Sequence, residues 1–413
     1  MYNYNIVKKL EPKKLILYGL FFWLILFVFS PFSLNQSPSL NWYIFIFLNV
    51  IFFLIGASVF HQRRKKYQID RYKINKLFYL FFWIALLGVS LKLFDKFFIR
   101  DISFGTSVFE NRDLSSLKSA NIIGIIGSLL SPISFYTFFL FYKYKIKLTK
   151  IMKIIVLAMP FLQVIDSIAI GSRSALLVTV IFILLILLIL NKIKFSFKKN
   201  IIYFSMFLSL LFFMQYIFIE RTREFIDESD IKSFPMEESV FNFTLKTNDE
   251  FQNYVKENNN IISNLLFSYT LSAKYYLHGM FELNYLINNF KHEHLYGEFT
   301  FSLYKRIFYK AIGRKYNTHY NIMPRNGIFT TFLGPIFIDF AWFSPLFLFI
   351  LGGYCKRVHN RLILNDDSSA MLYIYLASVI LFFPVFNFIS GVGGLYIFTS
   401  FLSINFITKL KLS

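Results

Sequence analysis

The sequence has a single cysteine, few charged residues and none of the common signatures of nucleotide-dependent enzymes. Cys355 is the only cysteine among 413 residues, which excludes an intrachain disulfide and a cysteine-based metal cluster. We find no nucleotide-phosphate loop, dinucleotide fingerprint, nucleophile elbow or Asp-x-Asp pair. Charged residues make up 16% of the chain, whereas soluble globular proteins carry about a quarter. We therefore expect no nucleotide cofactor, and the low content of charged residues favours a membrane protein.

Apolar residues dominate the chain and gather in long runs. They make up 56% of the sequence, and aromatic residues alone make up 21%. Runs of about 20 apolar residues match the thickness of the hydrocarbon core of a bilayer. The pattern predicts an all-α polytopic membrane protein with about ten transmembrane helices, at 15–34, 41–60, 77–94, 121–142, 151–170, 174–191, 201–219, 328–354, 370–388 and 392–408.

The basic residues lie in alternate loops. With a cytoplasmic N-terminus, the inward-facing segments account for the whole net charge of +21; these are 1–14, 61–76, 143–153, 192–200, 355–369 and 409–413. Lys and Arg near span ends mark the cytoplasmic side, so we expect both termini to be cytoplasmic. The distribution of the charge is then explained by membrane topology, so we do not expect nucleic acid as a partner. The basic segments would instead lie beside membrane lipid.

One long polar stretch divides the chain into helices 1–7 (1–219), a large external loop (220–327) and helices 8–10 (328–413). The loop holds thirteen Lys and Arg against thirteen Asp and Glu, and aromatic residues recur throughout it. Such a composition favours a folded, mostly helical cap over a disordered linker. Apolar spacing predicts a helix within 259–290. A basic amphipathic helix within 299–316 would lie at the membrane boundary or pack as an ordinary loop helix.

Ionisable residues inside spans are costly in lipid and are the first candidates for chemistry. Lys92, Asp166 and Asp339 are such residues. Asp166 ends one span, and Arg173 begins the next after a Gly-Ser turn. A guanidinium, free backbone N–H groups and the positive end of a helix dipole would converge there on an anion. The alternative is a structural Asp166–Arg173 pair that holds the hairpin together.

A second candidate group opens the long loop, at Glu220-Arg221-Thr222-Arg223-Glu224. Arg221 and Arg223 could clamp a pyrophosphate while Glu220 or Glu224 takes up a proton. The alternative is an ordinary charged end of a span.

A third group closes the loop. His319 is a candidate acid or base, although a lone loop histidine is often plain surface. Arg325 lies at the mouth of the eighth span. Two proline dipeptides interrupt that span, and a broken span tends to line a cavity; they are Gly334-Pro335 and Ser344-Pro345.

The stretch 292–298 has the one metal-like pattern, with two histidines and two glutamates. Two histidines at i and i+2 cannot share one face of a helix, and no third histidine is near. We therefore expect no metal and no other cofactor.

Two of these motifs resemble those of bacterial O-antigen and capsule repeat-unit polymerases (Wzy type). The layout of many spans with one dominant external loop is also similar. The motifs are Gly171-Ser172-Arg173-Ser174-Ala175 at the head of an apolar span, and Pro324-Arg325-Asn326-Gly327-Ile328-Phe329-Thr330 followed by Gly334-Pro335, Asp339-Phe340 and Gly352-Gly353. Where many members have glycines after the Asp-Phe, this chain has Ala341 and Ser344.

The resemblance implies transfer of a growing glycan from undecaprenyl pyrophosphate to a new lipid-linked repeat unit, at the periplasmic face of the inner membrane. It also implies chain-length regulator and flippase partners. Four arginines would stabilise the diphosphate leaving group without a metal, and a carboxylate or histidine would deprotonate the acceptor. The arginines are Arg173, Arg221, Arg223 and Arg325; the acid–base candidates are Glu220, Glu224, His319 and Asp166.

Other readings stay open. An O-antigen ligase uses the same kind of donor, and a peptidoglycan polymerase also has ten spans and a large loop before the eighth. A flippase or transporter of lipid-linked oligosaccharide belongs to another class. Transporters usually place charges deep in several spans, whereas charges here gather at the outer boundary.

Overall fold

The computed structural model describes most of the 413 residues. The described ranges are 4–60, 71–117, 121–162, 164–193, 240–258, 260–314, 322–325, 330–385, 387–389 and 392–412, with residue 328 and scattered residues between 196 and 236.

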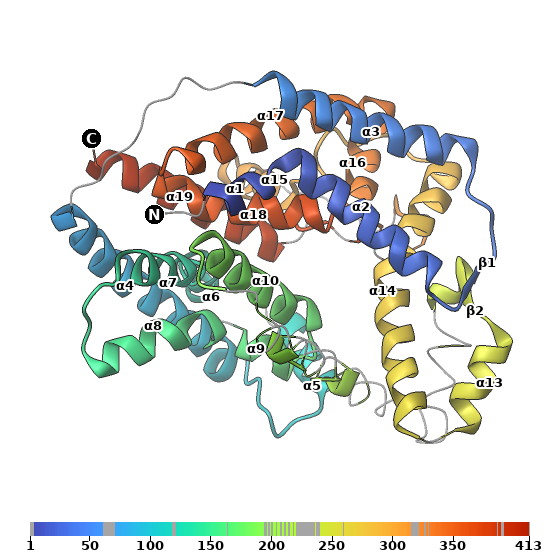
Figure 1. The fold of residues 1–413 in the computed structure, drawn as a ribbon, viewed down its shortest axis with the longest axis horizontal. Coiled ribbons are helices and arrows are strands. Elements are labelled where there is room, and N and C mark those ends of the chain that lie inside the picture. Colours follow the sequence, from blue (N-terminus) through green and yellow to red (C-terminus); the bar gives the residue numbers. More distant parts are fainter. Residues whose placement is uncertain are drawn as a thin grey trace.

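Helices form almost all of this part of the chain (Figure 1). The elements of the first half are α1 (Tyr4–Lys9), α2 (Pro12–Val28), β1 (Phe32–Leu34), α3 (Leu40–Val59), α4 (Arg71–Phe94), the π-helical η1 (Asp95–Ile99), α5 (Val108–Leu117), α6 (Ile122–Leu130), α7 (Ile133–Tyr144), α8 (Lys150–Leu162), α9 (Ile165–Ala169) and α10 (Arg173–Ile189). Those of the second half are η3 (Val240–Phe243), β2 (Leu245–Thr247), α13 (Asp249–Glu257), α14 (Ile261–Asn289), α15 (Ser302–Ala311), α16 (Leu333–Phe340), η5 (Ala341–Phe343), α17 (Ser344–Ile363), η6 (Asp367–Ser369), α18 (Ala370–Leu381) and α19 (Val392–Leu412).

The predicted helical fold is confirmed, and its long apolar helices are those of a membrane-embedded protein. Within the described residues, five helical stretches are long and apolar enough to cross a bilayer: Leu40–Val59, Tyr72–Ile99, Ile122–Tyr144, Lys150–Ala169 and Leu333–Ile363. Three of the other expected spans coincide with shorter apolar helices, at Ser174–Ile189, Asp367–Leu381 and Gly393–Thr408. The expected span at 201–219 lies largely outside the described residues.

The eighth expected span is interrupted. Its first helix ends at Phe340, Ala341 has a φ of 48°, and α17 begins at Ser344 with Pro345 in its first turn. Gly334-Pro335, by contrast, does not break a helix but begins α16, because proline is tolerated in the first turn. The expected loop helices are α14 and, over a shorter length than expected, α15.

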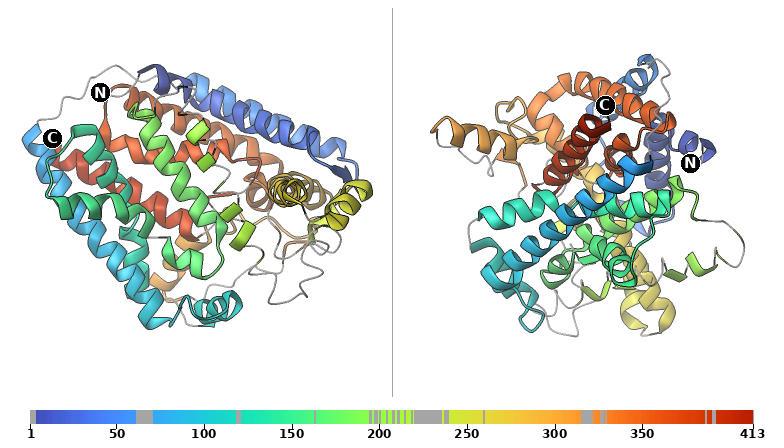
Figure 2. Two further views of the ribbon diagram at one scale, coloured as in Figure 1. Left: turned by 60° about the horizontal axis from the view of Figure 1, so that its bottom comes forward. Right: turned by 90° about the vertical axis from the view of Figure 1, so that its left-hand side faces the viewer.

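The first and last parts of the chain pack together, and α4 lies on the opposite side of the molecule from α3 (Figures 1 and 2). Glycines allow α3 and α17 to touch along their backbones. A Cβ at Gly56 would lie 2.0 Å from the Phe349 carbonyl oxygen, and one at Gly352 would lie 2.3 Å from that of Phe53. Small residues are the usual means of such close packing between membrane helices.

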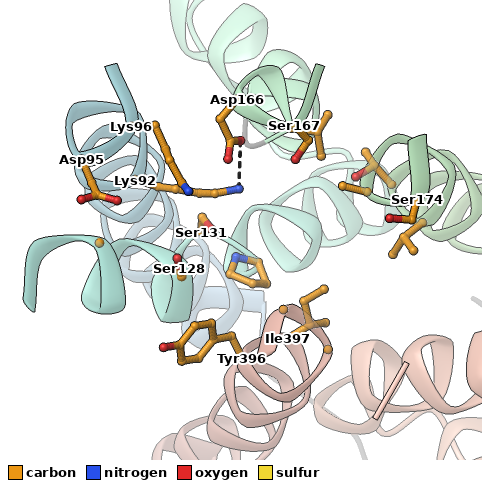
Figure 3. Close-up of a pocket in the computed structure, with 18 of the residues that line it drawn as sticks. Lys92, Asp95, Lys96, Ser128, Ser131, Asp166, Ser167, Ser174, Tyr396 and Ile397 are labelled. Carbon is orange, nitrogen blue, oxygen red and sulfur yellow. Dashed lines mark ion pairs between the residues drawn. The ribbon is translucent and has the colours of Figure 1, made fainter. Parts of the chain in front are cut away.

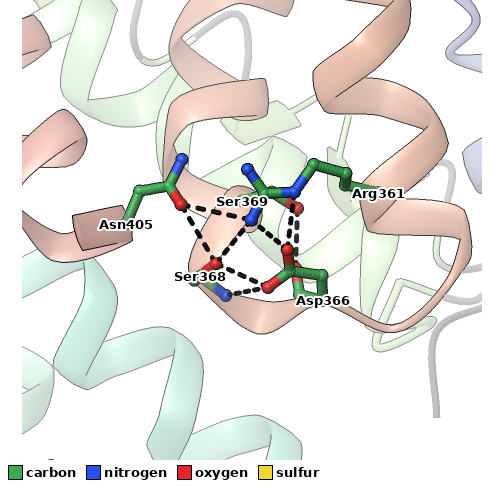
Figure 4. Close-up of polar contacts among 5 residues, drawn as sticks. All are labelled: Arg361, Asp366, Ser368, Ser369 and Asn405. Carbon is green, nitrogen blue, oxygen red and sulfur yellow. Dashed lines mark hydrogen bonds and ion pairs between the residues drawn. The ribbon is translucent and has the colours of Figure 1, made fainter. Parts of the chain in front are cut away.

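A buried polar network joins α17, η6 and α19 at the end of the bundle that we expect to face the cytoplasm (Figure 4). Arg361 donates to Asp366 over 2.7 Å from Nε, and to the Ser368 hydroxyl and the Asn405 side-chain oxygen over 3.1 and 3.2 Å. The neighbouring Asp367 accepts from Lys143 and Tyr144 of α7. Four helical elements are thus linked by charges that neutralise one another.

Replacing Asp366 by Ala should destabilise the protein. It leaves the Arg361 guanidinium buried and unpaired, which typically costs about 3–5 kcal/mol. Thermal unfolding of the detergent-solubilised protein, followed by tryptophan fluorescence, measures the loss. The control is Asp249→Ala, since its exposed pair with Lys246 should contribute about 0–1 kcal/mol. Equal melting temperatures for the two variants would contradict the role of the network.

Candidate functional site

A cavity of about 530 Å³ lies where several helices meet at the C-terminal end of α4 (Figure 3). Residues of α4, η1, α6, α9, α10, α14 and α19 line it. The basic residues Lys73 and Lys76 lie at the other end of α4. By the positive-inside rule, we therefore expect the cavity to lie at the external end of the bundle.

Three cations line the cavity at four-residue spacing: Lys92, Lys96 and Arg100. Residues four apart on a helix lie on the same face, one above the other. The helix also widens here, because α4 continues into the π-helical turn η1. Such turns are rare and often occur at functional sites.

Two carboxylates balance two of these cations. Arg100 Nε lies 3.1 Å from Asp95 Oδ2, and Asn121, the N-cap of α6, also donates to Asp95. Lys92 Nζ lies 3.2 Å from Asp166 Oδ1, which joins α4 to α9. Both carboxylates are almost fully buried.

Lys96 is the remaining cation of the cavity. Its Nζ lies 3.4 Å from the Ser115 hydroxyl, and it has no ion pair within the described part of the chain. The described lining residues therefore carry one positive charge in excess, three cations against two carboxylates. A cavity with such a charge in surroundings of low polarity attracts an anion.

Hydroxyl groups surround the charged groups. Figure 3 shows Ser128 and Ser131 near the two lysines, Ser167 beside Asp166, and Tyr396 on the facing side. Ser174, Thr179 and Tyr275 complete this set of donors and acceptors. Hydroxyls of this kind suit a ligand rich in oxygen, such as a phosphate or a sugar.

The Gly-Ser-Arg turn predicted from the sequence lies at this cavity. Gly171 has a φ of 66°, a backbone conformation that favours glycine, and Arg173 is the first residue of α10. The Arg173 side chain lies outside the described atoms, whereas Ser174, next along the chain, lines the cavity. The partner of Asp166 that the structure does show is Lys92, a pairing that the sequence analysis did not anticipate.

Five other predicted residues lie outside the described part of the chain. They are Glu220, Arg221, Arg223, Glu224 and His319. Their suggested roles stay predictions.

Arg325 is described, and it lies in the cap rather than among the lining residues of the cavity. Its Nη1 is 2.7 Å from Glu282 Oε1, and its Nη2 donates to the Val240 carbonyl over 2.6 Å. The guanidinium also lies 4.1 Å from the centre of the Phe243 ring. In this conformation Arg325 connects η3 to α14. Binding of pyrophosphate by Arg325, as predicted, would require its bonds to Glu282 and to the Val240 carbonyl to break.

The helix α14 connects the cap to the cavity. One face carries Lys274, His278 and Glu282, all buried under the segment that contains η3 and β2. Burial lowers the pKa of Lys274 to about 7 and that of His278 to about 4. Tyr275, on the same helix, lines the cavity. The antiparallel pairing of β1 with β2 joins the segment between α2 and α3 to this part of the structure.

Two other candidates have structural partners. Asp339 is buried and accepts hydrogen bonds from the backbone N–H groups of Phe299 and Thr300, over 2.9 and 2.7 Å. In the metal-like stretch, His294 Nδ1 lies 3.0 Å from the Ile338 carbonyl oxygen, and Glu298 pairs with Lys305. Within the described residues no group of three or more His, Cys, Asp or Glu could hold a metal ion.

Sequence reasoning missed Lys96, Asp95 and Arg100 as site residues. The signal that could have found them is the repeat of a cation at every fourth position across the end of the third expected span. Lys92 lies in the expected span 77–94, whereas Lys96 and Arg100 follow it in the expected loop. Sequence reasoning therefore does not place the three residues on one face of a single helix.

The pKa of Lys274 predicts a pH dependence of stability. Because burial lowers it from 10.5 to about 7, the unfolded chain binds more protons than the folded chain between these values. The free energy of unfolding should therefore rise with pH across this window. Replacing Lys274 by Met should remove that part of the rise, whereas the exposed Lys291→Met should not. Thermal unfolding from pH 7 to 10 measures the difference, and equal slopes in all three proteins would contradict it.

No family model, curated protein or solved structure matches the chain. Its function is therefore inferred from the chemistry of the cavity and from the motifs in the sequence.

Proposed function

We propose that this protein is a polymerase of lipid-linked oligosaccharide repeat units, with ten transmembrane helices and its large loop outside the cytoplasm. It would transfer the growing glycan from undecaprenyl diphosphate to the next lipid-linked unit, at the periplasmic face of a bacterial inner membrane. The single observation that carries the proposal is the cavity at the external end of α4, with its excess positive charge and its hydroxyl lining.

The position of the cavity suits a substrate that is held in a membrane. A lipid diphosphate presents its charge at the end of the apolar spans, which is where Lys92, Lys96 and Arg100 lie. The sugars beyond the diphosphate would then meet the cap, and Tyr275 extends the cavity toward α14. Aromatic side chains offer apolar area for sugar faces.

The reaction would be a direct displacement at the anomeric carbon. The bond from that carbon to the diphosphate oxygen breaks, and the leaving group keeps the electron pair. The acceptor hydroxyl oxygen forms the new glycosidic bond, and a carboxylate takes its proton. Lysine and arginine cations would stabilise the charge that develops on the diphosphate. The base would be Asp166, the carboxylate of the cavity whose described ion pair is with a lysine.

An O-antigen ligase is the second candidate, because the same cavity would accept the same kind of donor. Surface glycans in cells distinguish the classes. Loss of a polymerase leaves single repeat units on the surface, loss of a ligase leaves polymer on its carrier lipid, and loss of a flippase leaves no surface glycan. Deleting the gene and analysing surface and lipid-bound glycan by gel electrophoresis tests the proposal, and an unchanged polymer length would overturn it.

Lys96→Gln should lower the rate of polymerisation. Removing one group that stabilises transition-state charge typically lowers a rate by about 10²–10³-fold. The measurement is the chain length of surface glycan in cells that express the variant at normal abundance. The matched control is Lys291→Gln, because Lys291 is exposed, is expected on the same side and does not line the cavity. Normal chain length in Lys96→Gln would remove Lys96 from the site.

Arg173→Ala should abolish polymerisation while the protein inserts normally, since Arg173 is the first residue of α10 and its neighbour Ser174 lines the cavity. Arg173→Lys should also impair it, because an ammonium group lacks the bidentate geometry of arginine. Chain length in cells measures both variants. Substantial retained chain length in Arg173→Ala would count against its role.

The topology has a direct test in intact cells. In a Cys355→Ser background, a membrane-impermeant maleimide should label Lys291→Cys, in the expected external loop, and should not label Lys147→Cys, in an expected cytoplasmic one. Both positions are exposed, so accessibility within the fold is matched. The opposite labelling pattern would place the cavity in the cytoplasm and would end the polymerase assignment.

A further inference from the structure

Asp95, Asp166 and Asp339 are buried carboxylates in or near the expected spans, and they are held in different ways. Asp95 accepts hydrogen bonds from Arg100 and Asn121. Asp339 accepts two backbone N–H groups. These two carboxylates are fixed by several directional bonds, and their role is to hold the structure.

Asp166 is held more simply. Its side-chain contact within the described part of the chain is the ion pair with Lys92, at 3.2 Å between Nζ and Oδ1, and among the described residues that oxygen has no hydrogen-bond donor with good geometry. The two side chains are 17% and 5% exposed and come from separate helices, α4 and α9. Among the described side chains, Asp166 is therefore held by one ion pair to a flexible lysine, with Lys96 nearby, and such a pair is one that a competing anion can release.

The competing anion has a place to bind in the same cavity. Lys96 lies four residues from Lys92 on the same helical face, and Figure 3 shows both side chains beside the space that Asp166 also faces. A diphosphate carries more negative charge than one carboxylate and offers more oxygen acceptors. Two lysines would therefore bind it by charge-assisted hydrogen bonds, and Lys92 would have to be shared with it or given up by Asp166.

We propose that the Lys92–Asp166 ion pair is a catch that the lipid diphosphate releases, so that Asp166 becomes a catalytic base only when the donor is bound. The inference rests on the proposed function and adds a sequence of events to it. Donor diphosphate binds Lys92 and Lys96, Asp166 loses its cation, and the freed carboxylate takes the proton of the acceptor hydroxyl as the glycosidic bond forms. The lipid diphosphate then leaves, Asp166 gives its proton to water, and the ion pair forms again.

Such a catch would prevent Asp166 from acting as a base when no donor is bound. The ammonium group of Lys92 holds a carboxylate oxygen that would otherwise accept the proton of the acceptor hydroxyl. Without a donor, Asp166 would stay paired within apolar surroundings, where an unpaired charge is costly. The Lys92 charge is balanced in both states, first by Asp166 and then by phosphate.

The test measures binding and turnover separately, with the purified full chain in lipid nanodiscs. The probe is undecaprenyl diphosphate, and inorganic pyrophosphate is the lipid-free comparison. Asp166→Asn should bind undecaprenyl diphosphate about 3–10-fold more tightly than the wild type, because Lys92 no longer has a competing carboxylate. Lys92→Gln and Lys96→Gln should bind it more weakly. Asp166→Asn should also lose polymerisation in cells.

A double variant keeps the test decisive if Asp166→Asn alone folds poorly. In the Lys92→Gln background, Asp166→Asn should give no tighter binding, since the gain acts through Lys92. The control pair is Glu298→Gln, which removes the carboxylate from the ion pair with Lys305 outside the cavity and should leave affinity unchanged. Asp166→Asn affinity equal to or weaker than that of the wild type would overturn the catch.

Failure of the catch and failure of the proposed function are distinguishable. If the wild type binds no undecaprenyl diphosphate, the proposed function fails and the catch fails with it. If the wild type binds the lipid and Asp166→Asn does not tighten the binding, only the catch fails. If pyrophosphate competes as strongly as its lipid form, the cavity is a site for free anions, and the lipid-borne assignment is overturned.

Discussion

The fold depends on one constraint: a charge that is surrounded by apolar side chains must be neutralised by a partner. Ion pairs within the helices satisfy it for Lys92 with Asp166 and Arg100 with Asp95 at one end, and for Arg361 with Asp366 at the other. These pairs connect elements that are far apart in the chain. They therefore fix how the helices meet, while apolar packing between helices such as α3 and α17 supplies the rest of the contact.

The two ends of the bundle use this constraint differently. At one end, Arg361 and its partners are satisfied by several directional bonds, which suits a permanent joint. At the other end, the described lining of the cavity has one cation in excess, and Asp166 there is paired with Lys92. An arrangement of this second kind is less stable than a fully bonded one, and proteins retain such arrangements where a ligand completes the balance.

Much of the fold could be predicted from the sequence, because apolar length and charge distribution act locally. The long apolar helices, the helix α14 and the interruption before Ser344 all follow from residues that are close together in the chain. The site was only partly predictable. Asp166 and the turn at Gly171 could be recognised from their neighbours, but the contact of Asp166 with Lys92 depends on how two distant helices pack. The engagement of Arg325 with Glu282 is likewise a property of the folded cap.

The 29-residue helix α14 has a mechanical consequence. Because its hydrogen-bonded backbone is stiff, Tyr275 in the cavity and the Glu282–Arg325 contact in the cap cannot move independently. A lengthening glycan that pushes against the cap would therefore also displace a side chain next to the reacting groups. The helix would act as a lever: in the proposed polymerase, the length of the glycan at the cap would change the position of Tyr275 at the reaction site.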